Sequence, residues 1–126
     1  MRKIAEITTP IMKGSEDMAR SSFFLFSEEL VMRENMFQKK LISEVKEKFD
    51  GCVVLKNDAD YIQGIPDLLI LYKDKWAGLE VKKSANASHR PNQDYYVQRF
   101  DEMSFSRFIF PENKDEVLNE LERFFR

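Results

Sequence analysis

The sequence predicts a mixed α/β domain, in which a small mixed sheet is flanked by helices in the order α-β-β-β-α-β-α. Three observations support this prediction. Apolar residues recur at helical spacing before residue 50, and three short apolar runs separated by turn-forming residues follow between residues 52 and 83. Helical spacing returns from residue 91 onward, interrupted by one short segment in which apolar residues alternate. Helices mixed with short strands in this way are typical of a sheet covered by helices.

The composition is that of an ordinary globular domain. With 126 residues, 43% of them hydrophobic and 33% charged, the sequence is long enough to bury one core without covalent staples. The single cysteine, Cys52, excludes an internal disulfide and fits a reducing compartment. The formal net charge of −2 argues against tight, non-specific binding of nucleic acid over the whole surface.

Several kinds of segment are missing from the sequence. No apolar stretch approaches the roughly 20 residues that a membrane span requires. The first residues are interrupted by charges and lack the apolar core of a signal peptide. There is no Cys/His set for zinc and no glycine-rich phosphate loop. The sequence therefore predicts a cytoplasmic (intracellular) protein without membrane contact and without a nucleotide or organic cofactor.

Residues 1–26 are predicted to form an N-terminal extension to the main domain, which covers residues 27–126. The extension contains the strongly apolar run Phe-Phe-Leu-Phe over residues 23–26. One interpretation is that this run packs against the core of its own domain. The other is that it forms a surface for self-association, since large apolar patches on soluble proteins usually mark contacts.

The first predicted helix begins near Ser27 and ends at Asp50 and Gly51. Acidic residues follow Ser27, as the positive end of the helix dipole favours, and glycine commonly ends a helix. The apolar stripe of this helix consists of Phe37, Leu41, Val45 and Phe49. Glu34 lies on a neighbouring line of the helix and can point inward one turn before the stripe begins. The alternative is that Glu34 is one of many solvated charges.

Three strands are predicted next. Residues 52–56 form the first, and residues 57–64 form a polar loop whose Asn and Asp residues are typical turn formers. Residues 65–72 and 76–83 are two apolar runs joined by a short polar turn, which predicts a hairpin. Pro66 restricts the residue before it to extended geometry at the start of this hairpin.

Charged residues stand in this hairpin where buried strands usually have none. Asp67 opens one strand, and Glu80 and Lys82 lie two residues apart in the other. Alternate residues of a strand share a face, so Glu80 and Lys82 project together while Leu79 and Val81 point the other way. Carboxylates and an ammonium on one rigid surface suit the binding of a hard divalent cation and the positioning of a water. The alternative is a solvent-facing pair of charges on a half-exposed strand.

The length of the turn decides which residue lies opposite Asp67 across the hairpin. A two-residue turn at residues 73–74 places Asp67 opposite Glu80. A turn one residue later, or a four-residue loop, places it opposite Lys82. A three-residue loop would place it opposite Val81, on the other face of the sheet. Three of these four geometries therefore bring the charged side chains together.

The C-terminal third is predicted to contain two helices and a strand. Pro91 suits the first turn of a helix that runs to about Met103. A fourth strand is predicted over residues 105–110, and its alternating residues are Ser106, Phe108 and Phe110. Asn113 and Glu116 resemble the N-cap pair of a last helix. The apolar stripe of this helix consists of Val117, Leu118, Leu121, Phe124 and Phe125.

Four elements of the sequence, taken in order, match a known pattern. The run Gly-Ile-Pro-Asp-Leu-Leu over residues 64–69, followed by Glu-Val-Lys over residues 80–82, resembles the signature of the PD-(D/E)XK nuclease superfamily. Residues 34–41 resemble the first helix of that family, which has a glutamate near its start. Gln93 resembles the glutamine that opens the helix after the second motif strand. The similarity is greatest to the VRR-NUC type of small, often phage-encoded nuclease.

The resemblance implies a restriction-endonuclease-like core and Mg²⁺-dependent hydrolysis of phosphodiester bonds in DNA, with Mn²⁺ able to substitute. The implied catalytic residues are Asp67, Glu80, Lys82, Glu34 and Gln93. The expected metal ligands are the carboxylates of Asp67, Glu80 and Glu34 and the carbonyl of Val81. Lys82 is expected to orient or activate the attacking water and to stabilise the transition state. Gln93 is either a supporting residue of the site or an ordinary first-turn helix residue.

Basic residues close to the motif are expected to contact the substrate. Lys83, His89 and Arg90 follow the second motif strand and are candidates for phosphate binding, although a basic loop is often only solvated. The resemblance further implies a homodimer that acts on branched, Holliday-junction-like DNA. One alternative function is a catalytically silent nucleic-acid-binding or assembly module on the same fold. Another is an unrelated α/β protein, in which Asp67 and Glu80 would lie far apart.

Overall fold

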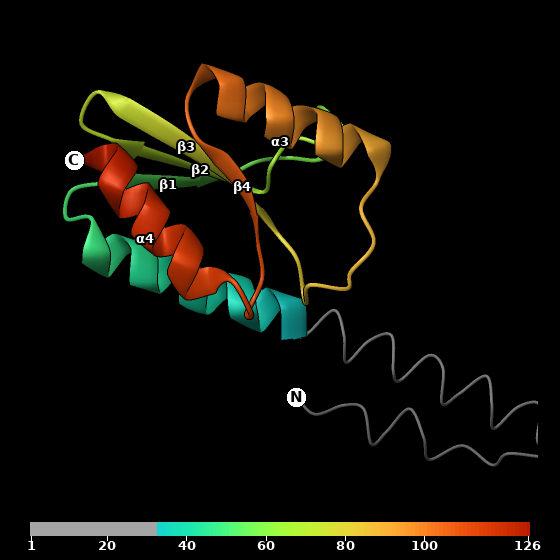
Figure 1. The fold of residues 1–126 in the computed structure, drawn as a ribbon, viewed down its shortest axis with the longest axis horizontal. Coiled ribbons are helices and arrows are strands. Elements are labelled where there is room, and N and C mark those ends of the chain that lie inside the picture. The colour runs from blue at the N-terminus through green and yellow to red at the C-terminus, as the bar shows by residue number, and fades with distance from the viewer. Residues whose placement is uncertain (1–32) are drawn as a thin grey trace, which may run out of the picture.

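The computed structural model describes residues 33–126, which form a four-stranded mixed sheet with helices on both faces (Figure 1). The elements are a helix over residues 33–48, β1 (Val53–Lys56), β2 (Leu68–Tyr72), β3 (Lys75–Val81), α3 (Pro91–Met103), β4 (Ser106–Ile109) and α4 (Lys114–Phe125). The predicted mixed α/β class and element order are confirmed. The predicted extension over residues 1–26 and the predicted helix start at Ser27 lie outside the described residues. No helix within residues 33–126 is long and apolar enough to cross a membrane.

The strands lie in the spatial order β1-β2-β3-β4. The pairs β1–β2 and β2–β3 are antiparallel, and β3–β4 is parallel. Leu68 pairs with Leu79 and Tyr72 pairs with Lys75, which leaves residues 73–74 as the two-residue turn. Lys73 takes the left-handed backbone conformation, with φ 56°, that such short hairpin turns favour. The first of the predicted registers is therefore confirmed, and Asp67 comes one step before the first pair, on the same side as Glu80.

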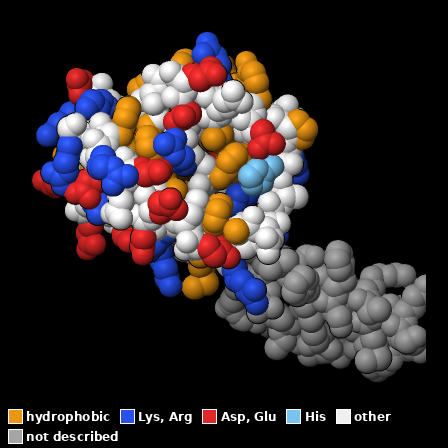
Figure 2. All heavy atoms as spheres, viewed as in Figure 1, with side chains coloured by type: hydrophobic (Ala, Val, Ile, Leu, Met, Phe, Trp, Pro, Cys, Tyr) orange, Lys and Arg blue, Asp and Glu red, His pale blue; other side chains and the backbone are white. Residues whose placement is uncertain are grey.

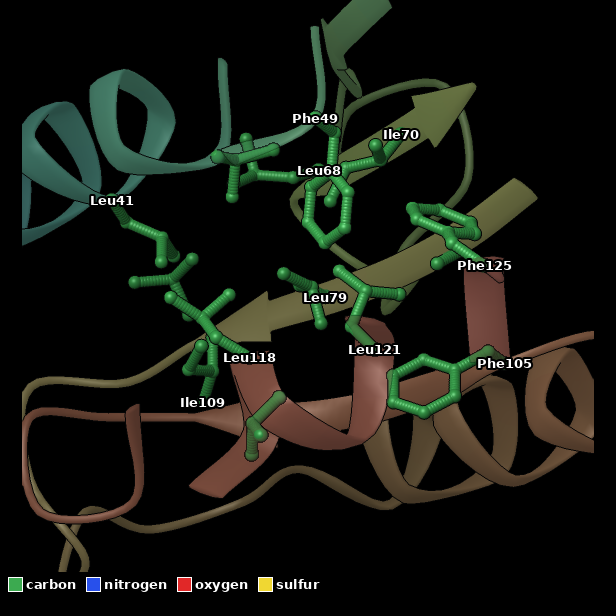
Figure 3. Packing of buried hydrophobic residues seen from close by; sticks show 14 residues of the cluster. Leu41, Phe49, Leu68, Ile70, Leu79, Phe105, Ile109, Leu118, Leu121 and Phe125 are labelled. Carbon is green, nitrogen blue, oxygen red and sulfur yellow. The ribbon is translucent and has the colours of Figure 1, made fainter. Parts of the chain in front are cut away.

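The core lies on one face of the sheet, beneath α4 and the helix over residues 33–48 (Figure 3). The labelled side chains of the strands and of these two helices point toward one another in this layer. The fully or almost fully buried members include Leu41, Val45, Phe49, Leu68, Ile70, Leu79, Leu118 and Leu121. Burying one such side chain contributes about 1.5–3 kcal/mol. The predicted helical stripe is confirmed from Leu41 to Phe49, and Phe37 is partly buried at its edge.

Helix α3 covers the opposite face of the sheet, over β3 and β4. Its Phe100 meets Trp76 edge to face, with ring centroids 5.5 Å apart. Gly78 allows this approach, because a Cβ there would lie 3.1 Å from the Phe100 ring and 3.4 Å from Pro66. The absence of a side chain in β3 thus lets α3 pack tightly, and this packing places the start of α3 beside the end of β3.

Two details of the structure differ from the prediction. Asn113 precedes α4, but its side chain makes no capping hydrogen bond to the helix. Its Oδ1 accepts from the Phe110 backbone N–H at 2.8 Å, and its Nδ2 donates to the Phe108 carbonyl at 3.1 Å. Asn113 is thus the N-cap residue of α4, as predicted, but the predicted capping pair with Glu116 is wrong, because the Asn113 side chain closes the turn after β4. Several strands are also a residue or more shorter than predicted.

Candidate active site

The candidate site lies where the start of β2, the end of β3, the start of α3 and the first described helix come together. In Figure 1 the N-terminal end of α3 and the residue-33 end of the first helix lie toward the same side of the sheet. A cavity of about 360 Å³ opens there. Its lining residues are Glu34, Asp67, Glu80, Lys82, Lys83, Ala87, Ser88, Arg90 and Gln93. The five side chains predicted to be catalytic thus share one cavity.

Glu80 and Lys82 are buried charged residues. Glu80 is 3% exposed and Lys82 is 8% exposed. Leu79 and Val81 point into the core on the opposite face, as the alternation of the strand predicts. A solvent-facing pair of charges is therefore excluded as an explanation of these two residues. Burying a charge without compensation is costly, so the surroundings of Glu80 and Lys82 decide what they can do.

Gln93 connects Glu80 to Lys82. Its Nε2 donates to Glu80 Oε2 at 2.9 Å, and its Oε1 accepts from Lys82 Nζ at 2.7 Å. The same Oε1 accepts from the Arg90 backbone N–H at 3.0 Å, just before α3. Lys82 Nζ also donates to the Ser88 carbonyl at 3.0 Å. The amide of Gln93 therefore orients both charged groups, which an ordinary first-turn helix residue would not do.

Asp67, just before β2, is held against the end of β3 by a hydrogen bond to its carboxylate. Its Oδ2 accepts from the Val81 backbone N–H at 2.8 Å. Asn57 secures the preceding backbone, because its N–H donates to the Asp67 carbonyl at 2.8 Å and its Nδ2 donates to the Pro66 carbonyl at 2.7 Å. Asp67 and Glu80 thus lie in one site, contrary to the expectation for an unrelated α/β protein with chance residues. Asn57 serves as a loop former, not as a residue of the cavity.

All three carboxylates of the site are held in surroundings that disfavour their charge. Burial raises the pKa of Glu80 to about 8, and the nearby Asp67 carboxylate adds to this shift. Burial likewise raises the pKa of Asp67, although the Val81 N–H opposes the shift. Burial, and then repulsion by Asp67, raises the pKa of Glu34. A cation placed among these groups would relieve both desolvation and mutual repulsion.

The residues present fit a divalent cation with oxygen ligands. Glu80 Oε1 is buried and has no hydrogen-bond partner among the described residues, although such atoms are normally paired. Within residues 33–126, no three His, Cys, Asp or Glu side chains are grouped as a ready-made metal cluster. Mg²⁺ does not require one, because it is commonly bound by one or two carboxylates and retains several waters. Asp67 and Glu80 supply such carboxylates.

The charge on Glu80 gives the fold a pH dependence. Its pKa is 4.5 in an ordinary setting and about 8 in the fold. Between these two pH values the folded state therefore binds more protons than the unfolded state. The stabilisation that the protonated Glu80 contributes to the fold is complete below pH 4.5 and is lost as the pH rises toward 8. We expect chemical denaturation in EDTA to show unfolding free energy falling over this range. Glu80→Gln should flatten the slope; an unchanged slope would contradict the assignment.

Of the three residues predicted to contact phosphate, two line the cavity and one does not. Lys83 and Arg90 line the cavity. His89 does not; its Nδ1 lies 3.0 Å from Asp94 Oδ1, and its ring stacks on Phe108 at 3.9 Å between centroids. On the face in Figure 2, Lys and Arg side chains are interspersed with Asp and Glu and do not gather in one basic patch. Phosphate binding at the site would therefore depend on the few cations of the cavity.

Two features of the site could not be predicted from the sequence. One is the Ser88 carbonyl, which any residue type would provide. The other is the approach of the loop before β2 to α3: Gly64 has φ +92°, and a Cβ there would lie 2.5 Å from Asn92 Cβ. The predicted signature included Gly64, but the contact with Asn92 joins elements far apart in the sequence and needs the fold to be seen.

Gly64→Ala is expected to destabilise the protein by about 1–3 kcal/mol, through left-handed backbone strain and the clash with Asn92. Thermal or chemical denaturation measures this change. Gly51→Ala is the matched control, because Gly51 has a similar φ of +88° but open space around its Cβ position. If both variants lose the same stability, the contact with Asn92 contributes nothing beyond backbone strain.

Comparison with known proteins agrees with this fold. No protein-family model matches the sequence, and no curated protein matches it. A solved structure described as a VRR_NUC domain is similar, with 28% sequence identity and a TM-score of 0.54. The match covers 73% of this chain and 97% of the other. The protein therefore has a VRR-NUC-like nuclease fold, as the resemblance predicted, and this is consistent with the PD-(D/E)XK superfamily.

Proposed function

We propose that this protein is a Mg²⁺-dependent DNA endonuclease, in which Mn²⁺ can replace Mg²⁺. The observation that supports the proposal most strongly is the buried Glu80 carboxylate, whose Oε1 has no partner within residues 33–126. Glu80 lines one cavity with Asp67 and with Lys82, whose ammonium is oriented by hydrogen bonds. A fold that resembles a VRR_NUC domain adds independent support.

Asp67, Glu80 and Glu34 are the proposed carboxylate ligands, and the Val81 carbonyl is a further candidate beside them. When bound, a divalent cation would polarise the phosphoryl group and lower the pKa of the attacking water. Through the cation that they hold, the carboxylates would position the scissile phosphate group. A bound cation would offset the burial and the mutual repulsion that raise the pKa values of these carboxylates.

Lys82 is proposed to act on the attacking water and on the charge that develops on phosphorus. Two of its three possible hydrogen bonds are made, to Gln93 Oε1 and to the Ser88 carbonyl. The remaining donor is available to a water or a phosphate oxygen in the cavity. An ammonium that is already oriented stabilises developing negative charge without first having to reorganise.

Lys83 and Arg90 are proposed to bind phosphates next to the scissile group, because both line the same cavity. His89 is proposed to contribute at the edge of the site, where its ring is held by Asp94 and Phe108. The substrate is proposed to be branched or Holliday-junction-like DNA. A two-fold homodimer would present one site to each of two strands, which symmetric cutting of a junction requires.

Single-turnover cleavage of a labelled four-way junction tests this function. With Mg²⁺ we expect two symmetric cuts, with slower or no cutting of linear duplex of the same sequence, and no product in EDTA. Junction binding in EDTA without cleavage in Mg²⁺ or Mn²⁺ would instead support a catalytically silent binding or assembly module. Equal cutting of junction and duplex would contradict structure specificity while leaving the nuclease activity in place.

Gln93→Leu is expected to lower kcat by about 10–100-fold with a small change in KM, because the side chain orients Lys82 and Glu80 and does not contribute the main binding contacts. Single-turnover and steady-state cleavage measure both constants. Gln98→Leu is the control, since Gln98 is an exposed residue of the same helix. An equal loss in both variants, or a rise in KM alone, would contradict the positioning role.

A further inference from the structure

A second cavity adjoins the proposed active site. It has a volume of about 180 Å³ and lies between the loop before β2 and the first turn of α3. It shares with the first cavity the residues Asp67, Glu80, Arg90 and Gln93. The side chains that belong only to the second cavity include Ala59, Asp60, Gln63, Ile65 and Asn92. A substrate group bound there would therefore lie directly beside the carboxylates.

The chemistry of the second cavity differs from that of the first. The first is lined by charged and polar side chains except for Ala87, whereas the lining of the second includes the apolar side chains of Ala59 and Ile65. Its volume of about 180 Å³ is half that of the first cavity, which suits a single ring system better than a whole nucleotide. Gln63 and Asn92 are exposed, and their amides are used by no hydrogen bond within the described residues.

Two other occupants fit this cavity less well. A second phosphate would meet the carboxylates of Asp60, Asp67 and Glu80, while Arg90 is the one cation among the lining residues. A metal ion would use only the carboxylates, and it would leave the apolar side chains of Ala59 and Ile65 in the lining without a contact. An uncharged planar ring with hydrogen-bonding edges matches the lining better than either.

We propose that this cavity binds the base of the nucleotide next to the scissile phosphate. The inference rests on the proposed nuclease function and specifies its substrate further. Asn and Gln amides each offer a donor and an acceptor, which is the pattern that reads base edges. Gln63 and Asn92 approach the edge of the base, and the apolar groups of Ala59 and Ile65 contact its face.

The binding of a base in this cavity limits which DNA can be a substrate. A base can enter the cavity only when it is unstacked and unpaired, and extracting it from a duplex costs free energy that an already unpaired base does not require. The enzyme therefore prefers DNA with an unpaired nucleotide at the cut, such as a flap or the branch point of a junction. Gly64 lines this cavity, and its missing side chain lets the loop lie directly against Asn92.

The first test removes the base from the substrate. After the cut is mapped, an abasic nucleotide is placed on either side of it in turn, and cleavage rates are compared. We expect one abasic position to slow the wild-type enzyme by about 10-fold. In the double variant Gln63→Ala/Asn92→Ala this penalty should shrink to less than about 3-fold, whereas Gln98→Ala should keep it in full. Equal cleavage of intact and abasic DNA by the wild type would overturn the inference.

The second test does not depend on cleavage. Side-chain amide signals of Gln63 and Asn92 are followed by ¹H–¹⁵N NMR while deoxynucleoside 5′-monophosphates are added in Mg²⁺. We expect both signals to shift with the nucleotides and not with inorganic phosphate, while Gln98 stays unchanged. The same shifts with inorganic phosphate, or none with any nucleotide, would overturn the inference. A protein that cuts no DNA refutes the proposed function, and this titration still decides on the cavity.

Discussion

Glu80→Gln is expected to reduce Mg²⁺-dependent cleavage by about 1000-fold while leaving the fold intact. Glutamine has the shape of glutamate and can still accept the hydrogen bond from Gln93 Nε2. Glutamine lacks the negative charge, and its amide NH₂ group takes the place of the buried, unpartnered oxygen that fits a divalent cation. Single-turnover cleavage measures the loss. Glu47→Gln, an exposed glutamate of the first described helix, is the matched control and should cleave at the wild-type rate.

The same substitution should have the opposite effect on stability. In EDTA near pH 8, Glu80→Gln is expected to increase the free energy of unfolding by about 1–3 kcal/mol, because a buried and poorly compensated charge is removed. Mg²⁺ or Mn²⁺ should raise the Tm of the wild type, since a ligand that binds only the folded state stabilises it. Neither ion should raise the Tm of the variant. A variant that is less stable in EDTA and still stabilised by Mn²⁺ would contradict the role of Glu80 as a ligand.

Lys82→Met is expected to reduce cleavage by about 100–1000-fold while leaving cation binding in place. Methionine fills similar space without the ammonium, which is held by Gln93 Oε1 and the Ser88 carbonyl and is available to the water or phosphate. Single-turnover cleavage is measured together with the Mn²⁺-induced rise in Tm. The rise should persist or increase, because a positive charge near the site has been removed.

Lys83→Ala separates the two neighbouring lysines. Lys83 is exposed and lines the cavity, whereas Lys82 is 8% exposed and hydrogen-bonded. We expect Lys83→Ala to weaken DNA binding by less than about 10-fold, with a smaller dependence on salt and an unchanged single-turnover rate at saturation. If Lys83→Ala were as severe as Lys82→Met, the special position of Lys82 would not explain the chemistry.

Local patterns in the sequence were sufficient for much of the site. The alternation of Glu80 and Lys82 against Leu79 and Val81 depends only on strand geometry, and the structure keeps it. The short polar turn restricted the hairpin to a few registers, of which the structure shows the one that puts Asp67 on the side of Glu80. These predictions succeeded because neighbouring residues alone determine them.

Features that depend on packing between distant elements were not predictable in the same way. Alternation could not distinguish a buried Glu80 from a solvated one, because its burial follows from the cover that α3 provides. The link from Gln93 to Lys82 spans 11 positions and needs the tight approach of α3 at Gly78. Asn113 was misread because an Asn near a helix start can satisfy the preceding turn as well as the helix.

The proposal that Asp67 and Glu80 hold a divalent cation is tested most directly by a crystal structure of the protein grown with Mn²⁺ and recorded at a wavelength that gives anomalous scattering from manganese. We expect an anomalous peak at a coordination distance of about 2 Å from Glu80 Oε1, shared with an Asp67 carboxylate oxygen. The peak should be absent from crystals of Glu80→Gln grown in the same way. An ordered site without manganese, or manganese bound elsewhere with Glu80 Oε1 still unpartnered, would contradict it.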